Sequence, residues 1–159
     1  MTGQQEFARI ENWLGDYEAA VFVCQVAAIS QIADDFVDGD VKKEDSSQAM
    51  VTMLELAMVG VPSSAFFRRH CDRLQPAITA ALGQWHMSNR LADDPKSNSV
   101  DLMFAFTWRH VIETVFYVTA HIIGGTAFAC EAAAKAYQYH HRDTGETFED
   151  WNTERLGHG

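Results

Sequence analysis

Apolar residues recur along most of this chain at spacings of three and four positions, which places them on one face of an α-helix. The alternation of apolar and polar residues that marks a half-buried strand is nearly absent. The sequence also has no Asn-Gly turn and only three prolines. The pattern therefore predicts an all-α fold.

Capping and helix-breaking residues divide this pattern into about six to seven helices. Asp16 is the expected N-cap of a long second helix, and Gly39 is the residue that ends it. The second and sixth helices are long and apolar, and shorter helices around them predict an irregular or orthogonal bundle. The expected segments are residues 7–14, 16–38, 45 or 46 to a break at 60–62, 63 or 64 to 74, 76–91, 100–123 ending at Gly124-Gly125, and 126–140.

The third of these helices carries five apolar residues at helical spacing. Methionines in such a pattern usually fill gaps in a core, because their side chains are unbranched and flexible. We therefore expect this side of the helix to face inward. The residues are Met50, Met53, Leu54, Ala57 and Met58.

The length and composition are those of one globular domain. With 159 residues, 47% of them hydrophobic, the chain is long enough to build its own core. We expect a single helical domain over residues 1–159. The segment after Arg142 is polar apart from Phe148 and Trp151, so residues 141–159 are expected to form a loosely docked tail.

The chain is acidic, with a net charge of −10 and only 12 basic residues. Affinity for nucleic acids comes mainly from clustered Lys and Arg side chains that contact phosphates, so the charge argues against nucleic acid as a partner. The densest basic group is Arg68-Arg69-His70 with Arg73. We expect it to be a solvated helix face.

Three widely spaced cysteines, Cys24, Cys71 and Cys130, lie in apolar helical segments without a CxxC or CxxH pair. This pattern favours buried free thiols in a reducing cytoplasm over a zinc site or disulfides. The N-terminus lacks the basic flank and apolar run of a signal peptide. Because no segment reaches the roughly 18 uninterrupted apolar residues of a membrane span, a membrane partner is not expected either.

The chemically richest feature is the acidic end of the second helix. Asp34, Asp35 and Asp38 are spaced to share one helical face within about one turn. The helix dipole already places partial negative charge at this end, and the three carboxylates also repel one another. Solvent, a basic side chain or a metal cation must therefore compensate the charge.

The first metal interpretation is magnesium. The DDxxD spacing of Asp34, Asp35 and Asp38 resembles the aspartate-rich motif of class I isoprenoid synthases, all-α enzymes that hold a diphosphate through Mg²⁺. The resemblance implies these three residues as metal ligands. It covers only this stretch, and residues 89–94 and Glu113 are weak substitutes for the second acidic motif of that family.

Two further interpretations of the cluster stay open. Residues 34–45 have the length of a calcium-binding loop between two helices, but Phe36 and Lys42 stand where such a loop needs oxygen ligands. Alternatively, the cluster is a solvated helix end in which one aspartate pairs with an arginine. Arg109 is the best candidate for that partner.

A polar stripe crosses the sixth predicted helix, which is otherwise apolar. A buried charge without a partner is costly, so this stripe must meet water or opposite charge. His110 and Glu113 could also share a metal with the aspartates, but the two Glu-x-x-His motifs of carboxylate-bridged bundles are missing, which favours ion pairing. The stripe and its flank are Arg109, His110, Glu113, Tyr117 and His121.

The run at residues 29–40 resembles a group of small helical proteins encoded by tailed bacteriophages. The likeness continues through residues 66–70, 74–76, 106–109 and 122–125 and covers most of the chain from about residue 20 to 140. It implies a phage origin and an all-helical fold, with the host cytoplasm or the virion as the location. It implies no reaction, but it places the aspartate cluster and Arg109 in matching segments.

These observations favour a phage-encoded helical protein that acts through protein–protein contacts, either associated with the virion or bound to a phage or host partner. The long apolar helices could also support a homodimer. One alternative is a Mg²⁺-dependent enzyme that acts on a phosphate or diphosphate compound through the DDxxD cluster. Another is an inhibitor whose acidic surface mimics nucleic acid.

Overall fold

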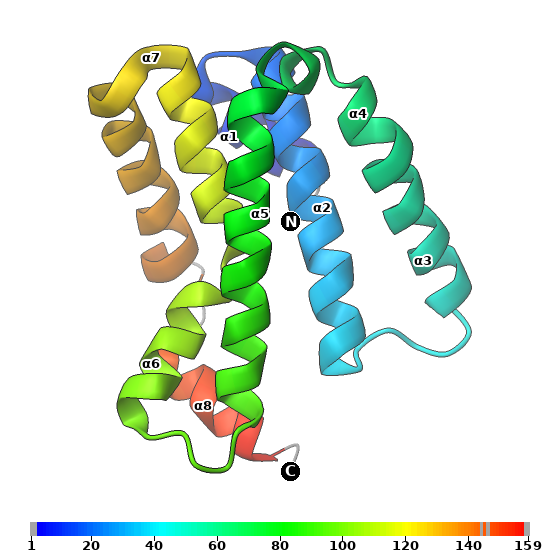
Figure 1. Cartoon of the computed structure of the whole chain (residues 1–159), viewed down its shortest axis with the longest axis vertical. Coiled ribbons are helices and arrows are strands. Elements are labelled where there is room, and N and C mark those ends of the chain that lie inside the picture. Colours follow the sequence, from blue (N-terminus) through cyan, green and yellow to red (C-terminus); the bar gives the residue numbers. More distant parts are fainter. Residues whose placement is uncertain (1–2, 144, 146, 158–159) are drawn as a thin grey trace.

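The computed structural model describes residues 3–143, 145 and 147–157. The chain is 87% helical and has no strand in these residues, so the prediction of an all-α bundle of about six to seven helices is confirmed. Figure 1 shows the arrangement. The elements are α1 (Gly3–Leu14), α2 (Tyr17–Asp38), α3 (Ser46–Glu55), α4 (Val61–Ser63), α5 (Ala65–Asp93), α6 (Ser99–Trp108), α7 (Val111–Tyr137) and α8 (Phe148–Gly157), with π-helical turns η1 (Leu56–Gly60) and η2 (Gln138–Asp143). Because α3, η1 and α4 run on without a break, as do α7 and η2, the described residues form seven continuous helices.

Side-chain caps set several of these helix ends. A carboxylate oxygen of Asp16 accepts a hydrogen bond from the Ala19 backbone N–H at 2.9 Å, and Gly39 ends α2 with a φ of 79°. The Ser64 hydroxyl accepts a hydrogen bond from the Phe67 N–H at the start of α5. The caps predicted at Asp16 and Gly39 are thus confirmed, and of the two serines expected to begin the next helix, Ser64 is the cap.

The single helix predicted over residues 100–123 is wrong. The chain breaks at His110 (φ −85°, ψ 68°), which separates α6 from α7. No glycine or proline marks this break in the sequence. It coincides instead with tertiary contacts, because Arg109 pairs there with two aspartates of α2.

The predicted turn at Gly124-Gly125 lies within α7. Gly125 has a φ of 74°, a conformation that residues with a Cβ rarely adopt. In Figure 1, the yellow part of α7 runs upward and turns at the top of the molecule, and the orange part then runs downward next to the yellow part. The two parts of α7 therefore form a helical hairpin.

Two other predicted boundaries are wrong. Residues 64–74 and 76–91 form the one helix α5, whose non-helical residue is His70 (φ −130°, ψ 20°) rather than the proline. Pro76 lies inside this helix and is tolerated there, at the loss of one backbone hydrogen bond. The expected break at residues 60–62 is shifted as well, because η1 and α4 carry the helix on to Ser63.

The core lies at one end of the bundle, between α1, the first half of α2, α5 and α7. Its largest fully buried side chains include Leu14, Phe22, Phe66, Leu74 and Val115. Phe22 stacks on Phe67 with ring centroids 5.8 Å apart. These contacts anchor the first half of α2, and the second half continues beyond them.

The prediction that the methionine-rich side of the third helix faces inward is wrong. None of the ten residues of α3, all of which the structure describes, is buried. Leu54 and Met58 are 46% and 72% exposed. The physical reason is that α3 packs mainly against α2, which covers only one side of it. Figure 1 shows α3 and α4 along the outer edge of the molecule, with α2 between them and the other helices.

The C-terminal segment forms α8, which packs on α6. Phe148 and Trp151 contact Phe106, with ring centroids 5.8 and 5.7 Å apart. These two aromatic residues dock the segment for which a loose tail was expected. Residues 144, 146, 158 and 159 of that segment lie outside the described residues.

Two helices in the described part are long and apolar enough to cross a membrane. They are residues 17–38 and residues 111–142, whose most apolar 18-residue windows have mean hydropathies of 1.5 and 1.4. The pair 46–63 and 65–93 would be a third span only if its 98° bend is counted within one span. Because residues 111–142 turn back at Gly125, each part is shorter than the roughly 30 Å of a bilayer core. That no membrane is a partner stays a prediction.

Candidate functional site: a compensated aspartate cluster and an uncovered helix face

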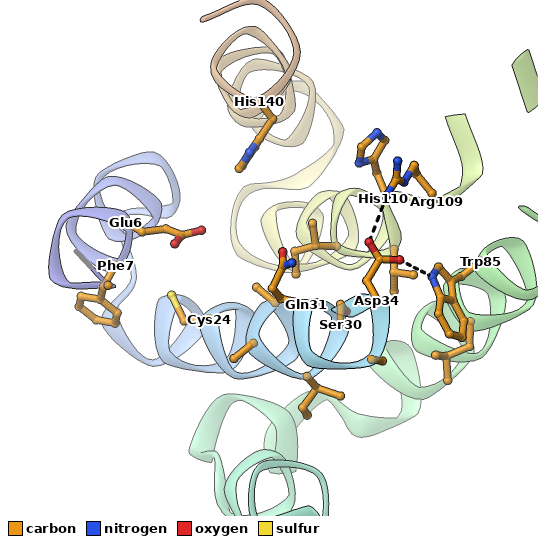
Figure 2. A pocket seen from close by; sticks show the side chains of 18 residues that line it. Glu6, Phe7, Cys24, Ser30, Gln31, Asp34, Trp85, Arg109, His110 and His140 are labelled. Carbon is orange, nitrogen blue, oxygen red and sulfur yellow. Dashed lines mark hydrogen bonds and ion pairs between the residues drawn. The ribbon is translucent and has the colours of Figure 1, made fainter. Parts of the chain in front are cut away.

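The aspartate cluster lies at the exposed end of α2, opposite the junction of α6 and α7. Asp34 accepts a hydrogen bond from Arg109 Nη2 at 3.2 Å through one oxygen, and one from Trp85 Nε1 at 3.2 Å through the other. Figure 2 shows both contacts as dashed lines. The Arg109 and Asp34 side chains are 18% and 28% exposed, so the pair is partly withdrawn from water. Arg109 thus supplies the positive charge that the sequence requires at this helix end.

The other two aspartates differ from Asp34. Asp38 lies 3.7 Å from Arg109 and is half-exposed. Burial and the neighbouring Asp34 raise the pKa of Asp38, although Arg109 opposes the shift. Asp35 accepts a hydrogen bond from Gln31 Nε2 at 2.6 Å. The cluster is therefore one compensated carboxylate with two more exposed neighbours.

This arrangement bears on the metal hypothesis. Within the described residues, no group of three or more His, Cys, Asp or Glu side chains converges as metal ligands would. Asp34 and Asp38 both lean toward Arg109, whose cation occupies the place between them. A magnesium ion bound by Asp34, Asp35 and Asp38 would have to displace Arg109. The metal site stays a prediction.

His110 and Glu113 do not join the aspartates. Glu113 pairs with Nε2 of His141, which comes from η2 near the end of the chain and is only 14% exposed. The His110 ring packs edge-on against His141, with centroids 4.6 Å apart. The sequence marks His141 only as a surface or helix-end residue, because nothing in the spacing shows that η2 folds back onto the start of α7.

His110 is held neutral by its surroundings. Burial lowers its pKa to about 4, and His141 and Arg109 act in the same direction, whereas Glu113 acts against them. Its buried Nε2 atom has no hydrogen-bond partner among the described residues. At neutral pH, therefore, His110 packs as an aromatic ring.

His121, the last residue of the polar stripe, meets the basic group on α5. Nδ1 of His121 lies 2.9 Å from Arg73, and Arg69 pairs with Glu18 of α2 at 2.5 Å. The three arginines of this group are exposed, as expected for a solvated helix face. His121, Arg69 and Arg73 thus have partners within the fold.

A cavity of about 780 Å³ runs along α2 and ends at Asp34. In Figure 2, Glu6 of α1 and His140 of η2 point into it at the opposite end. Its floor between the two polar ends is lined by the small side chains of Ala27 and Ala28, followed by Gln31. A largely apolar ligand with polar ends would suit this lining.

The cysteines differ from the sequence expectation of three buried thiols. Cys24 is half-buried and lines the cavity, where burial and the charge of Glu6 raise its pKa to about 11. Its thiol is therefore protonated and a poor nucleophile. Cys71 and Cys130 are exposed, because their sides of α5 and α7 face away from the core. For these two residues the expectation is wrong.

A second candidate surface is the outer side of α3 and η1, called here the α3 face. Sequence reasoning missed it, because the same apolar spacing describes an inward side and an uncovered one. Residues 49–60 are apolar on nearly all sides, and a helix of this kind is normally covered on all sides. The α3 face comprises Met50 (41% exposed), Val51 (45%), Leu54 (46%), Met58 (72%) and Val59 (62%).

Comparisons of the chain with models of protein families, with curated proteins and with solved structures found no match. The resemblances to tailed-bacteriophage proteins and to isoprenoid synthases therefore stay expectations from the sequence. The geometry of the aspartate cluster, the cavity and the α3 face is therefore the basis for proposing a function.

Proposed function

We propose that the chain is a bacteriophage-encoded helical protein that acts through protein–protein contacts, in the virion or on a phage or host partner in the host cytoplasm. The observation that carries this proposal is the α3 face, where five large apolar side chains within ten residues are exposed. Contiguous apolar surface of this kind usually marks an interaction site. The resemblance to phage proteins supports the phage origin.

The composition of the α3 face fits a protein partner. Interface cores are depleted of charged residues, and methionine is among the residues enriched there. Within residues 46–60, Glu55 is the single charged residue, in a chain whose net charge is −10. Two methionines on the face add flexible side chains that adapt to a binding surface.

The compensated aspartate cluster supports the same proposal. A phosphate-transferring site needs carboxylates that are free to hold Mg²⁺. Here Asp34, a partly buried carboxylate of the cluster, already has a cation and a neutral donor as partners. This end of α2 therefore acts as a structural joint between α2, α5 and the start of α7.

The test is photo-crosslinking in the cells that naturally make the protein. A benzophenone amino acid replaces Leu54 in one variant and Met103, an equally apolar and 58% exposed residue of α6, in the matched control. We expect a covalent protein adduct at position 54, its loss when Met58→Glu is added, and none at position 103. Adducts at neither position, or equally at both, would overturn the proposal.

A second candidate is a Mg²⁺-dependent enzyme that acts on a phosphate or diphosphate compound, favoured by the cavity that ends at Asp34. Its test is thermal unfolding with and without millimolar Mg²⁺ or Mn²⁺. If the enzyme hypothesis is right, metal raises the melting temperature, and Asp34→Asn with Asp38→Asn abolishes the rise. If metal causes no shift, the hypothesis is wrong.

A further inference from the structure

We infer that the α3 face binds a second copy of the same chain, in an antiparallel two-fold arrangement. The inference rests on the proposed function and names the partner for that surface. A homodimer with two-fold symmetry needs one patch that is complementary to itself. The residue spacing and side-chain sizes support self-complementarity of this face, and surface area and charge are compatible with the association.

The first argument is the residue spacing on the outer side of α3. Ser47, Val51, Leu54 and Met58 follow one another at spacings of four, three and four, and all four are exposed. This is the spacing of the seam along which two helices pack side by side. The seam runs through the α3 face and lies on the side away from α2, where nothing in the described part of the chain covers it.

The second argument is the size of the seam residues. In an antiparallel pair centred between Val51 and Leu54, these two residues oppose each other across the two-fold axis. The small Ser47 then opposes the large Met58 of the other copy at each end. A parallel pair would place Met58 against Met58 and would leave a gap between the two serines. Antiparallel packing therefore fills the seam better and also opposes the two helix dipoles.

The third argument is surface area. The chain exposes 9789 Å², whereas a compact monomer of 17.8 kDa is expected to expose about 8,000 Å². The excess of about 1,800 Å² is larger than the roughly 800 Å² that each partner contributes to a standard interface. The excess belongs to the whole chain, and the exposed apolar side chains of the α3 face are part of it.

The fourth argument is charge. The whole chain at −10 repels itself, but residues 42–59 contain Lys42 and Lys43 against Glu44, Asp45 and Glu55. The net charge of this segment is −1, so the α3 face is where two copies approach with little repulsion. Figure 1 shows α3 at the outer edge of the molecule, where the rest of the bundle does not block a second copy.

The inference is tested by sedimentation equilibrium on the full chain at 1–200 µM. We expect a reversible dimer, and we expect Leu54→Glu with Met58→Glu to weaken its Kd at least 100-fold while helical content, from circular dichroism, stays unchanged. The matched control Met103→Glu, on the exposed side of α6, should leave the Kd within about threefold. A wild-type monomer at 200 µM, or a dimer insensitive to Leu54→Glu with Met58→Glu, overturns the inference.

Orientation is tested by disulfide formation in a background with Cys71→Ser and Cys130→Ser. Chains with Ser47→Cys, mixed with chains with Met58→Cys, should crosslink to each other. Chains with Met58→Cys alone should not, because the two copies of position 58 lie about 16 Å apart along the seam. Crosslinking of Met58→Cys alone would overturn the antiparallel arrangement. A monomeric chain that still gives a position-54 adduct with another protein would refute the dimer and leave the proposed function standing.

Discussion

The two halves of α2 belong to one uninterrupted helix and yet have opposite surroundings. Residues 17–26 contain five buried side chains, Ala19, Ala20, Phe22, Val23 and Val26. Residues 27–38, all of them described, contain none that is buried. The first half is enclosed by α1, α5 and α7, whereas the second borders the cavity, the aspartate cluster and α3.

The difference shows that the two halves of α2 have different roles. The first half stabilises the fold, and the second half forms surfaces that contact the cavity, the aspartate cluster and α3. The apolar residues of the first half build the core. The second half also carries apolar residues, and an 18-residue window of α2 has a mean hydropathy of 1.5. Their neighbour α3 covers α2 but is itself uncovered on its other side. Four changes, ordered by how much each should alter the unfolding free energy, test this difference between the halves.

The largest effect is expected for Phe22→Ala in the first half of α2. Phe22 is fully buried and contacts two phenylalanines of α5, so its loss leaves a cavity and should cost about 3–5 kcal/mol of unfolding free energy. Urea denaturation measures this. The matched change in the second half, Val37→Ala at a 54% exposed position, should stay within about 0.5 kcal/mol. Equal costs would contradict the comparison.

Acid should destabilise the fold through His110, at the edge of the second half. Its folded pKa of about 4 lies below the ordinary value of 6.5, so the unfolded chain takes up the proton first as the pH falls. The contribution of neutral His110 to the unfolding free energy is fully present above pH 6.5. It is lost between pH 6.5 and 4, by up to about 3 kcal/mol. His110→Phe should flatten this part of the curve in urea titrations at each pH. An unchanged curve would count against a buried neutral His110.

Breaking the Asp34–Arg109 pair should have an intermediate effect. Asp34→Asn leaves a partly buried arginine with a weaker partner, and we expect a loss of about 1–2 kcal/mol, between the values for exposed and buried ion pairs. A double-mutant cycle with Arg109→Gln should show a coupling of about 1 kcal/mol. A coupling near zero would mean that Arg109 does not compensate the cluster.

The smallest effect should have the opposite sign. Asp38→Asn removes a charge that repels Asp34 and opposes the dipole at the end of α2, so it should stabilise the fold by about 0.3–1 kcal/mol at pH 7. The pKa of Asp38 is raised in the fold, so its penalty exists at high pH and disappears as the pH falls below the ordinary value for aspartate. The gain should vanish in urea titrations near pH 3. Destabilisation at pH 7 would show that the 3.7 Å contact with Arg109 matters more than repulsion.

The fold was largely predictable from the sequence, because its signals are local. Asp16, Gly39 and Ser64 cap helices through contacts within a few residues. Arg109 was identified as the partner of the aspartates from charge balance alone. It lies 75 residues from Asp34 along the chain, but it is the one Lys or Arg within the apolar segment 100–123.

The parts that could not be predicted depend on tertiary contacts. The break before α7 has no local breaker, and the Glu113–His141 pair forms only because Gly125 turns α7 back on itself. The α3 face has the same spacing as a core-facing helix, so its exposure depends on whether anything in the chain covers it. The spacing of apolar residues predicts that a helix has an apolar side, but it does not show which segment or molecule covers that side.

Coverage of the α3 face by a second copy is tested most directly by hydrogen exchange of residues 46–60 at 1 µM and at 200 µM protein. If a second copy covers the α3 face, the backbone amides of these residues exchange at least tenfold more slowly at the higher concentration. The amides of α6, whose outer side also exposes Met103 and Phe104, stay unchanged. If exchange in residues 46–60 does not depend on protein concentration, no second copy covers the α3 face.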